Sequence, residues 1–283
     1  GDGVYRSTDG GESWKNVGLP DSERIVKLSV DPRNGETVLV CVTGRLWSDS
    51  TDRGVYRTTD GGKSWTQVLG GNASTGCGGM SVDAKNPDVM FASLWDFRRK
   101  GWTFRSGGEG PDAPSGSGLY RSADGGKTWN EVTGGGLPAK PYGRIAVAVA
   151  PSNSNVVYAF IEGVKGALFR SDDGGKTWDR RDDSQMMVWR PFYFANLIVD
   201  PANADRVFKD DGNLILSEDA GRSFSVVGGF EGMHGDIHDV WVNPKNSKHV
   251  VSGDDGGLWQ SHDGGSKWWK GENLPISQFY HVS

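Results

Sequence analysis

Short runs of alternating apolar and polar residues dominate this chain, and turn-forming sequences separate them. In one unit, the four successive runs are Ile25 to Val30, Thr37 to Val42, Gly54 to Thr58 and Ser64 to Val68. Alternation with a period of two is typical of half-buried β-strands, and no segment has convincing helical periodicity. The pattern therefore predicts an all-β protein made of four-stranded antiparallel units.

A box of the form Ser/Thr-x-Asp-x-Gly-x-x-Trp/Phe recurs six times, each time between two strand runs. Its aspartates are Asp9, Asp60, Asp124, Asp173, Asp219 and Asp263, at spacings of 51, 64, 49, 46 and 44 residues. Asp and Gly supply the turn of a β-hairpin. A repeat of this length with four strands is typical of a propeller blade, because one small sheet cannot bury both of its faces alone.

Lettering the strands A to D from the propeller axis outward gives a count of the blades. The chain supplies strands C and D of a first blade, then five complete blades, then one strand near Gln278 to Val282. About six blades are thus represented in a single domain of residues 1–283. Because a strand needed for closure is missing, we expect this propeller to be a fragment of a longer chain with further blades or domains.

Composition supports this picture and excludes several classes of protein. The 43 glycines, 12 prolines and 35% apolar residues suit many short strands and tight turns. A net charge of -5 without a basic block argues against a nucleic-acid partner. No apolar stretch approaches the ~20 residues that cross a bilayer. The chain begins without Met, at Gly1 inside a strand pattern, so the lack of a signal peptide says little about location.

Cys41 and Cys77 are the two cysteines. Two residues are too few for a disulfide framework, and their positions in the repeat are too far apart for a metal clip. Because a disulfide needs close Cα atoms, we expect two buried free thiols.

In an up-and-down blade, alternate connections fall on opposite faces of the disc. The boxes and the A to B turns share one face, where the Ser/Thr and Asp side chains can bond the local backbone and the aromatic packs between strands. We therefore expect the six boxes to be structural. A calcium loop of the EF-hand type needs a spaced run of oxygen ligands ending in Glu, which no box supplies. We expect neither a metal nor a cofactor.

The B to C and D to A loops share the opposite face and differ from blade to blade. One of them, from Asp96 to Gly118, is a long excursion of the kind that is usually functional or disordered. Aromatic and arginine side chains suit sugar stacking and carboxylate pairing, although aromatics can also plug the mouth of the disc. The candidate ligand contacts are Arg45, Trp47, Trp95, Arg98, Arg99, Trp102, Arg105, Arg144, Trp189, Arg190 and Tyr193.

The segment from His234 to Asp239 holds two imidazoles and two carboxylates in six residues. One reading is that these side chains only satisfy each other and the loop backbone. A second is acid/base chemistry by Asp236 or Asp239 with Asp254 or Asp255. A third is a metal site with Asp236 and His238, for which no third ligand can be named. The candidate catalytic residues are Asp236, Asp239, Asp254, Asp255, His234 and His238.

The boxes resemble Asp-box, or bacterial neuraminidase (BNR), repeats. The whole chain resembles large bacterial proteins with sortilin-type N-terminal propellers, often labelled glycosyl hydrolases or BNR-repeat proteins. The motifs that carry the resemblance are Trp102 to Gly108, Trp189 to Tyr193, His234 to Asp239, Gly253 to Gly257 and Gln278 to Tyr280. This resemblance implies an exported protein, periplasmic or extracellular, with a longer parent chain.

Three functional relatives share the box. Sialidases carry an Arg-Ile-Pro signature, whereas here Arg144 and Ile145 precede Ala146. Xyloglucan-degrading hydrolases are similar in their boxes and Trp-rich faces, but they place two catalytic aspartates in separate propellers. Sortilin-type receptors bind peptides and proteins without a catalytic set. The resemblance therefore favours a scaffold that binds a glycan or protein through the Arg/Trp-rich loops, with a glycoside hydrolase as the alternative.

Overall fold

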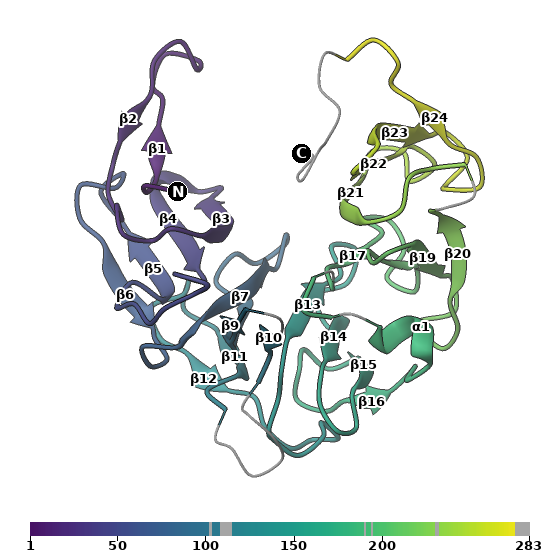
Figure 1. The fold of residues 1–283 in the computed structure, drawn as a ribbon, viewed down its shortest axis with the longest axis horizontal. Coiled ribbons are helices and arrows are strands. Elements are labelled where there is room, and N and C mark those ends of the chain that lie inside the picture. Colours follow the sequence, from purple (N-terminus) through teal and green to yellow (C-terminus); the bar gives the residue numbers. More distant parts are fainter. Residues whose placement is uncertain (102–103, 108–114, 190, 194, 230–231, 275–283) are drawn as a thin grey trace. The chain divides into compact units, whose positions relative to one another are not determined.

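The computed structural model describes residues 1–101, 104–107, 115–189, 191–193, 195–229 and 232–274, and side chains at 104 and 105 are outside the description. Within them the chain is almost entirely β-structure, with one short helix, α1 (Gln185–Val188). It divides into two compact units (Figure 1): unit 1 is Gly1–Thr133 with Ala139–Ile145, and unit 2 is Gly134–Pro138 with Ala146–Ser283. The expectation of a single domain remains a prediction.

Unit 1 contains a two-stranded sheet, two four-stranded sheets and a small inserted hairpin, all antiparallel. The first sheet is β1 (Tyr5–Arg6) with β2 (Lys15–Asn16). The second is β3 (Ile25–Asp31), β4 (Asn34–Val42), β5 (Gly54–Thr58) and β6 (Thr66–Leu69). The third is β7 (Thr75–Val82), β8 (Met90–Asp96), β11 (Gly118–Ser122) and β12 (Asn130–Glu131), and the hairpin is β9 (Arg98–Arg99) with β10 (Phe104–Arg105).

Unit 2 contains three four-stranded sheets in which each strand pairs with the next along the chain. The first is β13 (Ile145–Val149), β14 (Val157–Ile161), β15 (Ala167–Ser171) and β16 (Asp179–Arg180). The second is β17 (Leu197–Val199), β18 (Val207–Lys209), β19 (Leu214–Ser217) and β20 (Ser225–Gly228). The third is β21 (Ile237–Val242), β22 (Val250–Asp254), β23 (Gly257–Ser261) and β24 (Trp269–Lys270).

These sheets confirm the predicted all-β class and the four-stranded antiparallel blades. The β1–β2 sheet has the two strands expected of the first blade, and five complete sheets follow it. The long excursion between β8 and β11 carries the β9–β10 hairpin without changing the strand order. The last predicted strand, near Gln278 to Val282, lies outside the described residues.

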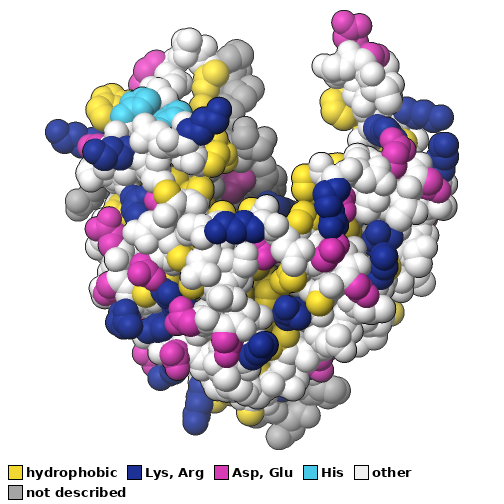
Figure 2. Space-filling model, turned by 180° about the vertical axis from the view of Figure 1, so that it is seen from behind, with side chains coloured by type: hydrophobic (Ala, Val, Ile, Leu, Met, Phe, Trp, Pro, Cys, Tyr) yellow, Lys and Arg dark blue, Asp and Glu magenta, His cyan; other side chains and the backbone are white. Residues whose placement is uncertain are grey.

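Apolar residues pack between neighbouring sheets, as their alternation requires. In unit 1, Leu39 and Val55 from one sheet contact Met80, Met90 and Leu94 from the next, among other buried residues. In unit 2, an equivalent cluster forms around Tyr158, Phe160, Leu168, Leu197 and Ile215. On the surface, Figure 2 shows basic and acidic side chains interspersed over one face rather than gathered in a single block.

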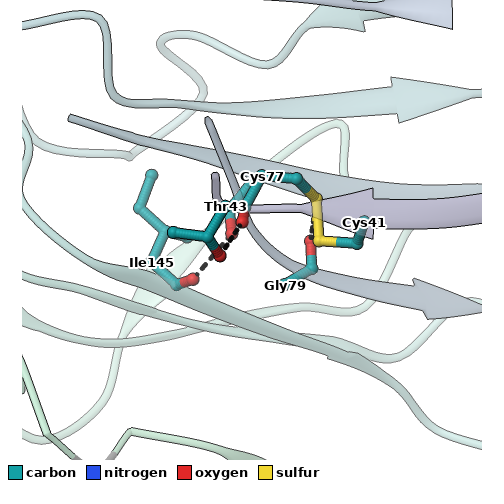
Figure 3. The surroundings of a disulfide bond; sticks show 6 residues. Cys41, Thr43, Cys77, Gly79 and Ile145 are labelled. Carbon is teal, nitrogen blue, oxygen red and sulfur yellow. Dashed lines mark hydrogen bonds between the residues drawn. A yellow bond between two sulfur atoms is a disulfide. The ribbon is translucent and has the colours of Figure 1, made fainter. Parts of the chain in front are cut away.

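The expectation of two free thiols is wrong, because Cys41 and Cys77 form a disulfide with a Cα–Cα distance of 5.1 Å. Cys41 lies in β4, the second strand of its sheet, and Cys77 lies in β7, the first strand of the next sheet (Figure 3). Their 36-residue separation suggested different places in the repeat, but sheet stacking brings these two strands together. Thr43 Oγ1 donates a hydrogen bond to the Cys77 carbonyl at 2.8 Å beside the bridge.

The six boxes make one hydrogen-bond pattern. In each, the Ser/Thr hydroxyl donates to the aspartate at 2.7–2.8 Å and accepts from the amide four residues after it. Hydrogen bonds, chiefly from the residue just before the aromatic, hold the pKa of every box carboxyl below its usual value. The box contacts are therefore those of a closed hairpin turn.

Two of the box aromatics also connect neighbouring sheets. The indole Nε1 of Trp65 donates to the Val17 carbonyl at 2.8 Å, and that of Trp268 donates to the Val227 carbonyl at 2.6 Å. Both carbonyls belong to residues of the preceding sheet region. In these two units the box thus closes its own hairpin and also links its sheet to the one before.

Candidate binding face in two units

Two buried arginines hold the loop that follows β4 in unit 1. Arg53, 1% exposed, donates to the carbonyls of Thr43 at 2.5 Å and Ser48 at 3.0 Å, and also to that of Arg45. Arg98, 8% exposed, donates to the same Arg45 carbonyl at 3.0 Å and to Ser48, and it pairs with Asp49. The predicted contact Arg98 is therefore a buried support of the loop.

Trp47 lies at the outside of this loop with 62% of its surface exposed. The guanidinium carbon of Arg99 is 5.8 Å from the centroid of the Trp47 ring, and the Arg99 amide donates to the Leu46 carbonyl at 2.8 Å. The Arg45 side chain is half-exposed, and its Nε lies 4.0 Å from Glu23 Oε2. Of the predicted contacts in unit 1, Trp47 and Arg99 are thus brought together, and Arg45 belongs to the same loop but pairs with Glu23.

Trp95 lies near the end of strand β8 and is 5% exposed. Its Nε1 donates to the Ser106 carbonyl at 2.9 Å, and the guanidinium carbon of Arg144 stacks 4.7 Å from the ring centroid. This pair resembles the aromatic plug that was the alternative to ligand binding. Three predicted contacts cannot be placed: Trp102, Arg190 and the side chain of Arg105 lie outside the described residues.

In unit 2, an exposed tryptophan ring and the backbone of a half-buried aspartate contact the same glycine. Trp189 is 40% exposed, and its ring lies so close to Gly212 that an added Cβ there would be 2.7 Å from Cζ3. The Gly212 carbonyl accepts the Asp236 amide at 3.0 Å. Asp236 has a left-handed backbone with φ of 60°, which is uncommon for a residue other than glycine. Among the described residues, its carboxylate has no hydrogen-bond or ion-pair partner.

A buried group of charges supports this corner, and sequence reasoning missed it. Lys209 is 0% exposed and pairs with Asp211, whose side chain is 3% exposed. Asp210 accepts from the amide of Asn196 at 2.6 Å and from its Nδ2 at 2.7 Å. The Asp211 carbonyl also accepts the Ile237 amide at 2.9 Å. The sequence feature that could have indicated this group is the Lys-Asp-Asp-Gly run at residues 209–212, directly after a short apolar strand.

Of the remaining candidates, His238 and Asp239 are hydrogen-bonded, Asp254 is buried and His234 is exposed. His238 Nε2 lies 2.7 Å from Asp255 Oδ1, and Asp239 Oδ1 accepts the Val240 amide at 2.9 Å. Asp254 is fully buried; its Oδ1 accepts the Gly256 amide at 2.8 Å, and burial raises the pKa of its carboxyl. His234 is exposed, and its Cβ would lie 2.6 Å from a Cβ added at Gly256.

Tyr193, the last predicted contact in unit 2, is 41% exposed, and its ring centroid lies 5.1 Å from that of Phe192. Asp236 and Trp189 together offer a carboxylate able to accept or donate a proton and an apolar ring face.

Among the described residues, no group of three or more His, Cys, Asp or Glu side chains is placed to hold a metal ion. Within the same residues, no helix could span a membrane.

Comparison with protein families finds the BNR/Asp-box repeat at residues 5–16, 120–131 and 169–180. Among curated proteins, the chain is 32% identical over 130 residues to a probable oligoxyloglucan-reducing end-specific xyloglucanase of Neosartorya fischeri, covering 45% of this chain and 14% of that protein. It is 28% identical over 134 residues to a xyloglucanase of a Paenibacillus species, covering 46% and 12%. The matches thus span less than a fifth of the relatives.

Solved structures of similar fold include GH74 enzymes. An ancestral GH74 enzyme matches 95% of this chain and 36% of its own, with a TM-score of 0.66 and 19% identity. The GH74 xyloglucanase of Xanthomonas campestris matches 98% and 50%, with a TM-score of 0.55 and 18% identity. The chain therefore carries BNR/Asp-box repeats and has a β-propeller fold.

Proposed function

We propose that this chain is a propeller of a glycoside hydrolase that acts on xyloglucan or a similar glucan. The observation that carries the proposal is the corner of unit 2 where Trp189 lies on Gly212 and Gly212 holds Asp236. An exposed indole face suits stacking on a sugar ring. A half-buried carboxylate that has no partner among the residues the structure describes suits proton transfer to or from a glycosidic oxygen or water.

The comparisons support a hydrolase over the non-catalytic scaffold that the sequence favoured, because the matched curated proteins are named xyloglucanases. Hydrolysis of a glycosidic bond uses two carboxyl groups on either side of it. Asp236 is our candidate for one of them. The other is assigned to the rest of the protein, since the chain covers half or less of the GH74 structures. The sortilin-type resemblance stays a prediction.

The test is hydrolysis of xyloglucan by the full-length protein, measured as release of reducing ends. Asp236→Asn should lower kcat about 100-fold with little change in KM, because it removes proton transfer and keeps the side-chain shape. Trp189→Ala should raise KM about tenfold, because it removes a stacking surface. The matched controls are Asp21→Asn and Trp14→Ala, which change an exposed carboxylate and an exposed indole elsewhere. Unchanged kinetics in both site variants would contradict the proposal.

We also propose that the parent protein is exported, to the periplasm or the extracellular space, where it meets its glycan. The Cys41–Cys77 disulfide supports this location, because such bonds persist in oxidising compartments. Cell fractionation with a blot for the protein would test it. Recovery in the cytoplasmic fraction with reduced cysteines would overturn the assignment.

A further inference from the structure

We propose that a β-hairpin from another part of the same polypeptide, outside residues 1–283, covers the side of the β3–β6 sheet that carries Leu28 and Val30. The hairpin pairs with the edge of β1 that lies opposite β2, and it completes the first blade. Three observations carry the inference: two exposed apolar side chains on an inner strand, an interface that covers half of a sheet face, and an open strand edge. The inference does not depend on the proposed hydrolase activity.

The exposed apolar side chains lie on β3. Leu28 is 44% exposed and Val30 is 48% exposed. They are opposite Val40 and Val38 of β4, so they belong to the same side of the sheet as these two residues. Val40 and Val38 pack with Val4 of the first blade. Leu28 and Val30 therefore face the region where the first two strands of that blade would lie.

Equivalent positions in unit 2 are buried. Val240 and Val242 of β21 stand at the same distances from the turn that ends their strand, and each is 4% exposed because it packs in a cluster with Phe208 of the preceding sheet. Leu197 and Val199 of β17 are 8% and 5% exposed. An apolar residue at these places in the repeat is thus normally covered by the sheet before it. In β3 the two side chains lack that cover.

The contact between the first two sheets covers the outer half of the face. Val4 is buried against Val40 and Val42, and the Trp65 indole donates to the Val17 carbonyl at 2.8 Å. These contacts come from residues next to β1 and β2, which correspond to the third and fourth strands of a complete blade. The apolar surface on β3 continues this interface inward. A surface of this kind is typical of a site that another strand covers.

Backbone groups on the open edge of β1 are directed away from β2. The Val4 amide donates to the Gly18 carbonyl at 2.9 Å, and the Val4 carbonyl accepts from the Val17 amide at 2.8 Å. Successive residues of an antiparallel strand direct these groups to opposite edges, so those of Tyr5 point to the other edge. Among the described residues, β1 pairs with β2 alone, whereas the equivalent strand β5 pairs with both β4 and β6. The edge is therefore suited to the addition of a strand.

The geometry and the length of the chain define the occupant. In each complete sheet, two strands precede the strand that leads into the box, so the occupant is a hairpin rather than a single strand. Its covering residues are apolar at alternate positions. We assign it to the same polypeptide because the surface continues an interface within the chain. The chain also spans half or less of the GH74 structures that it matches, so proteins of this fold contain further polypeptide.

The test is the reaction of an introduced thiol with a maleimide in the native full-length protein, without reductant, so that the Cys41–Cys77 bond stays intact. Val30→Cys should react at least about tenfold more slowly than Val226→Cys, because the hairpin covers the first thiol. Val226 is the matched control, since it is 50% exposed on β20, away from this surface. Equal rates in the two folded variants would overturn the proposal.

Two further measurements identify the occupant. Hydrogen exchange at the Tyr5 amide should be as slow as at Tyr56, the equivalent residue of β5, because a paired edge protects it; fast exchange at Tyr5 would contradict the strand pairing. Light scattering should show that the protected Val30→Cys protein is a monomer. Protection that disappears when a dimer is diluted would mean that a second copy covers the surface, and the proposal would then be wrong. Xyloglucan hydrolysis enters none of these measurements, so this proposal and the proposed function can fail separately.

Discussion

The loop sides of the two units are both built on buried cations, but the cations are neutralised in different ways. In unit 1, Arg53 is surrounded by backbone carbonyls of the loop after β4. In unit 2, Lys209 at the end of β18 pairs with the Asp211 carboxylate and lies 5.7 Å from the Phe160 ring centroid. The difference follows from side-chain chemistry, because Arg has five planar donors whereas Lys is a compact point charge.

This contrast shows how one repeat supports two kinds of loop. Arg53 can hold a long loop because it reaches several carbonyls, although burial and the nearby charge of Arg98 lower its pKa to about 10. Lys209 holds the short Asp211–Gly212 turn through a single ion pair. The loop held by Arg53 leaves Trp47 exposed. The turn held by Lys209 places Gly212, which has no side chain, against the ring of Trp189.

The largest expected effect is on the ion pair of unit 2. Lys209→Met should lower the free energy of unfolding by about 3–5 kcal/mol, because it removes the cation of a buried ion pair and leaves the buried Asp211 carboxylate without that compensating charge. Arg53→Met should cost about 1–3 kcal/mol, since Arg98 still donates to two of the three carbonyls. Denaturant unfolding of both variants checks the order. The double variant Lys209→Met with Asp211→Met should recover much of the loss, and an Arg53 effect larger than the Lys209 effect would break the comparison.

The second-largest expected effect is that of removing the disulfide. Both of its cysteines lie in unit 1, so its loss should destabilise unit 1 more than unit 2. The double substitution Cys41→Ala and Cys77→Ala should lower the free energy of unfolding by about 2–4 kcal/mol, because the unfolded chain gains conformational entropy when the crosslink is absent. Hydrogen exchange should show faster opening in β4 and β7 than in β14 and β18. Treatment of the wild-type protein with a reductant under mild denaturation should reproduce the result, and uniform destabilisation of both units would contradict it.

Two aspartates of unit 2 should respond to pH with opposite signs. The pKa of Asp219 is lowered to about 2 by hydrogen bonds, chiefly from Ser223, so its contribution to stability is present above about pH 4 and is lost as the pH falls to 2. Burial raises the pKa of Asp254, so its ionised form opposes folding at neutral pH. Asp254→Asn should therefore stabilise the protein by about 1 kcal/mol at pH 7, whereas Asp219→Asn should destabilise it. Thermal melts between pH 2 and 7 test both signs; a stabilising Asp219→Asn at pH 7 would refute the first.

The smallest effect concerns a single box. Ala220 has φ of 65° at a position where the other five boxes have glycine with φ between 71° and 83°. Ala220→Gly should stabilise unit 2 by about 0.5 kcal/mol, because relief of the left-handed strain slightly exceeds the entropy that glycine adds to the unfolded chain. The reverse change, Gly174→Ala, should destabilise by a similar amount in the same melting assay.

Local patterns predicted the fold, because strand alternation and box turns act within a few residues. The predicted runs Thr37 to Val42 and Gly54 to Thr58 lie in β4 and β5. The pattern could not show that Cys41 and Cys77 face each other, because that depends on the stacking of two sheets. Nor could it separate the exposed Trp47 from the buried Trp95, since both lie in Arg/Trp-rich stretches of the sequence, although Trp95 belongs to strand β8. Lys209 was missed because a charged residue at a strand end ordinarily indicates solvent.

The disulfide has a consequence for how the molecule comes apart. Stacked repeats contact mainly their neighbours, so unfolding can begin at one end and proceed sheet by sheet. The Cys41–Cys77 bond joins the β3–β6 sheet to the sheet that contains β7. Those two sheets therefore cannot separate in succession while the bond is intact. Unfolding that proceeds sheet by sheet and reaches β4 must stop there or unfold both linked sheets together. The disulfide therefore sets the size of one cooperative unfolding unit.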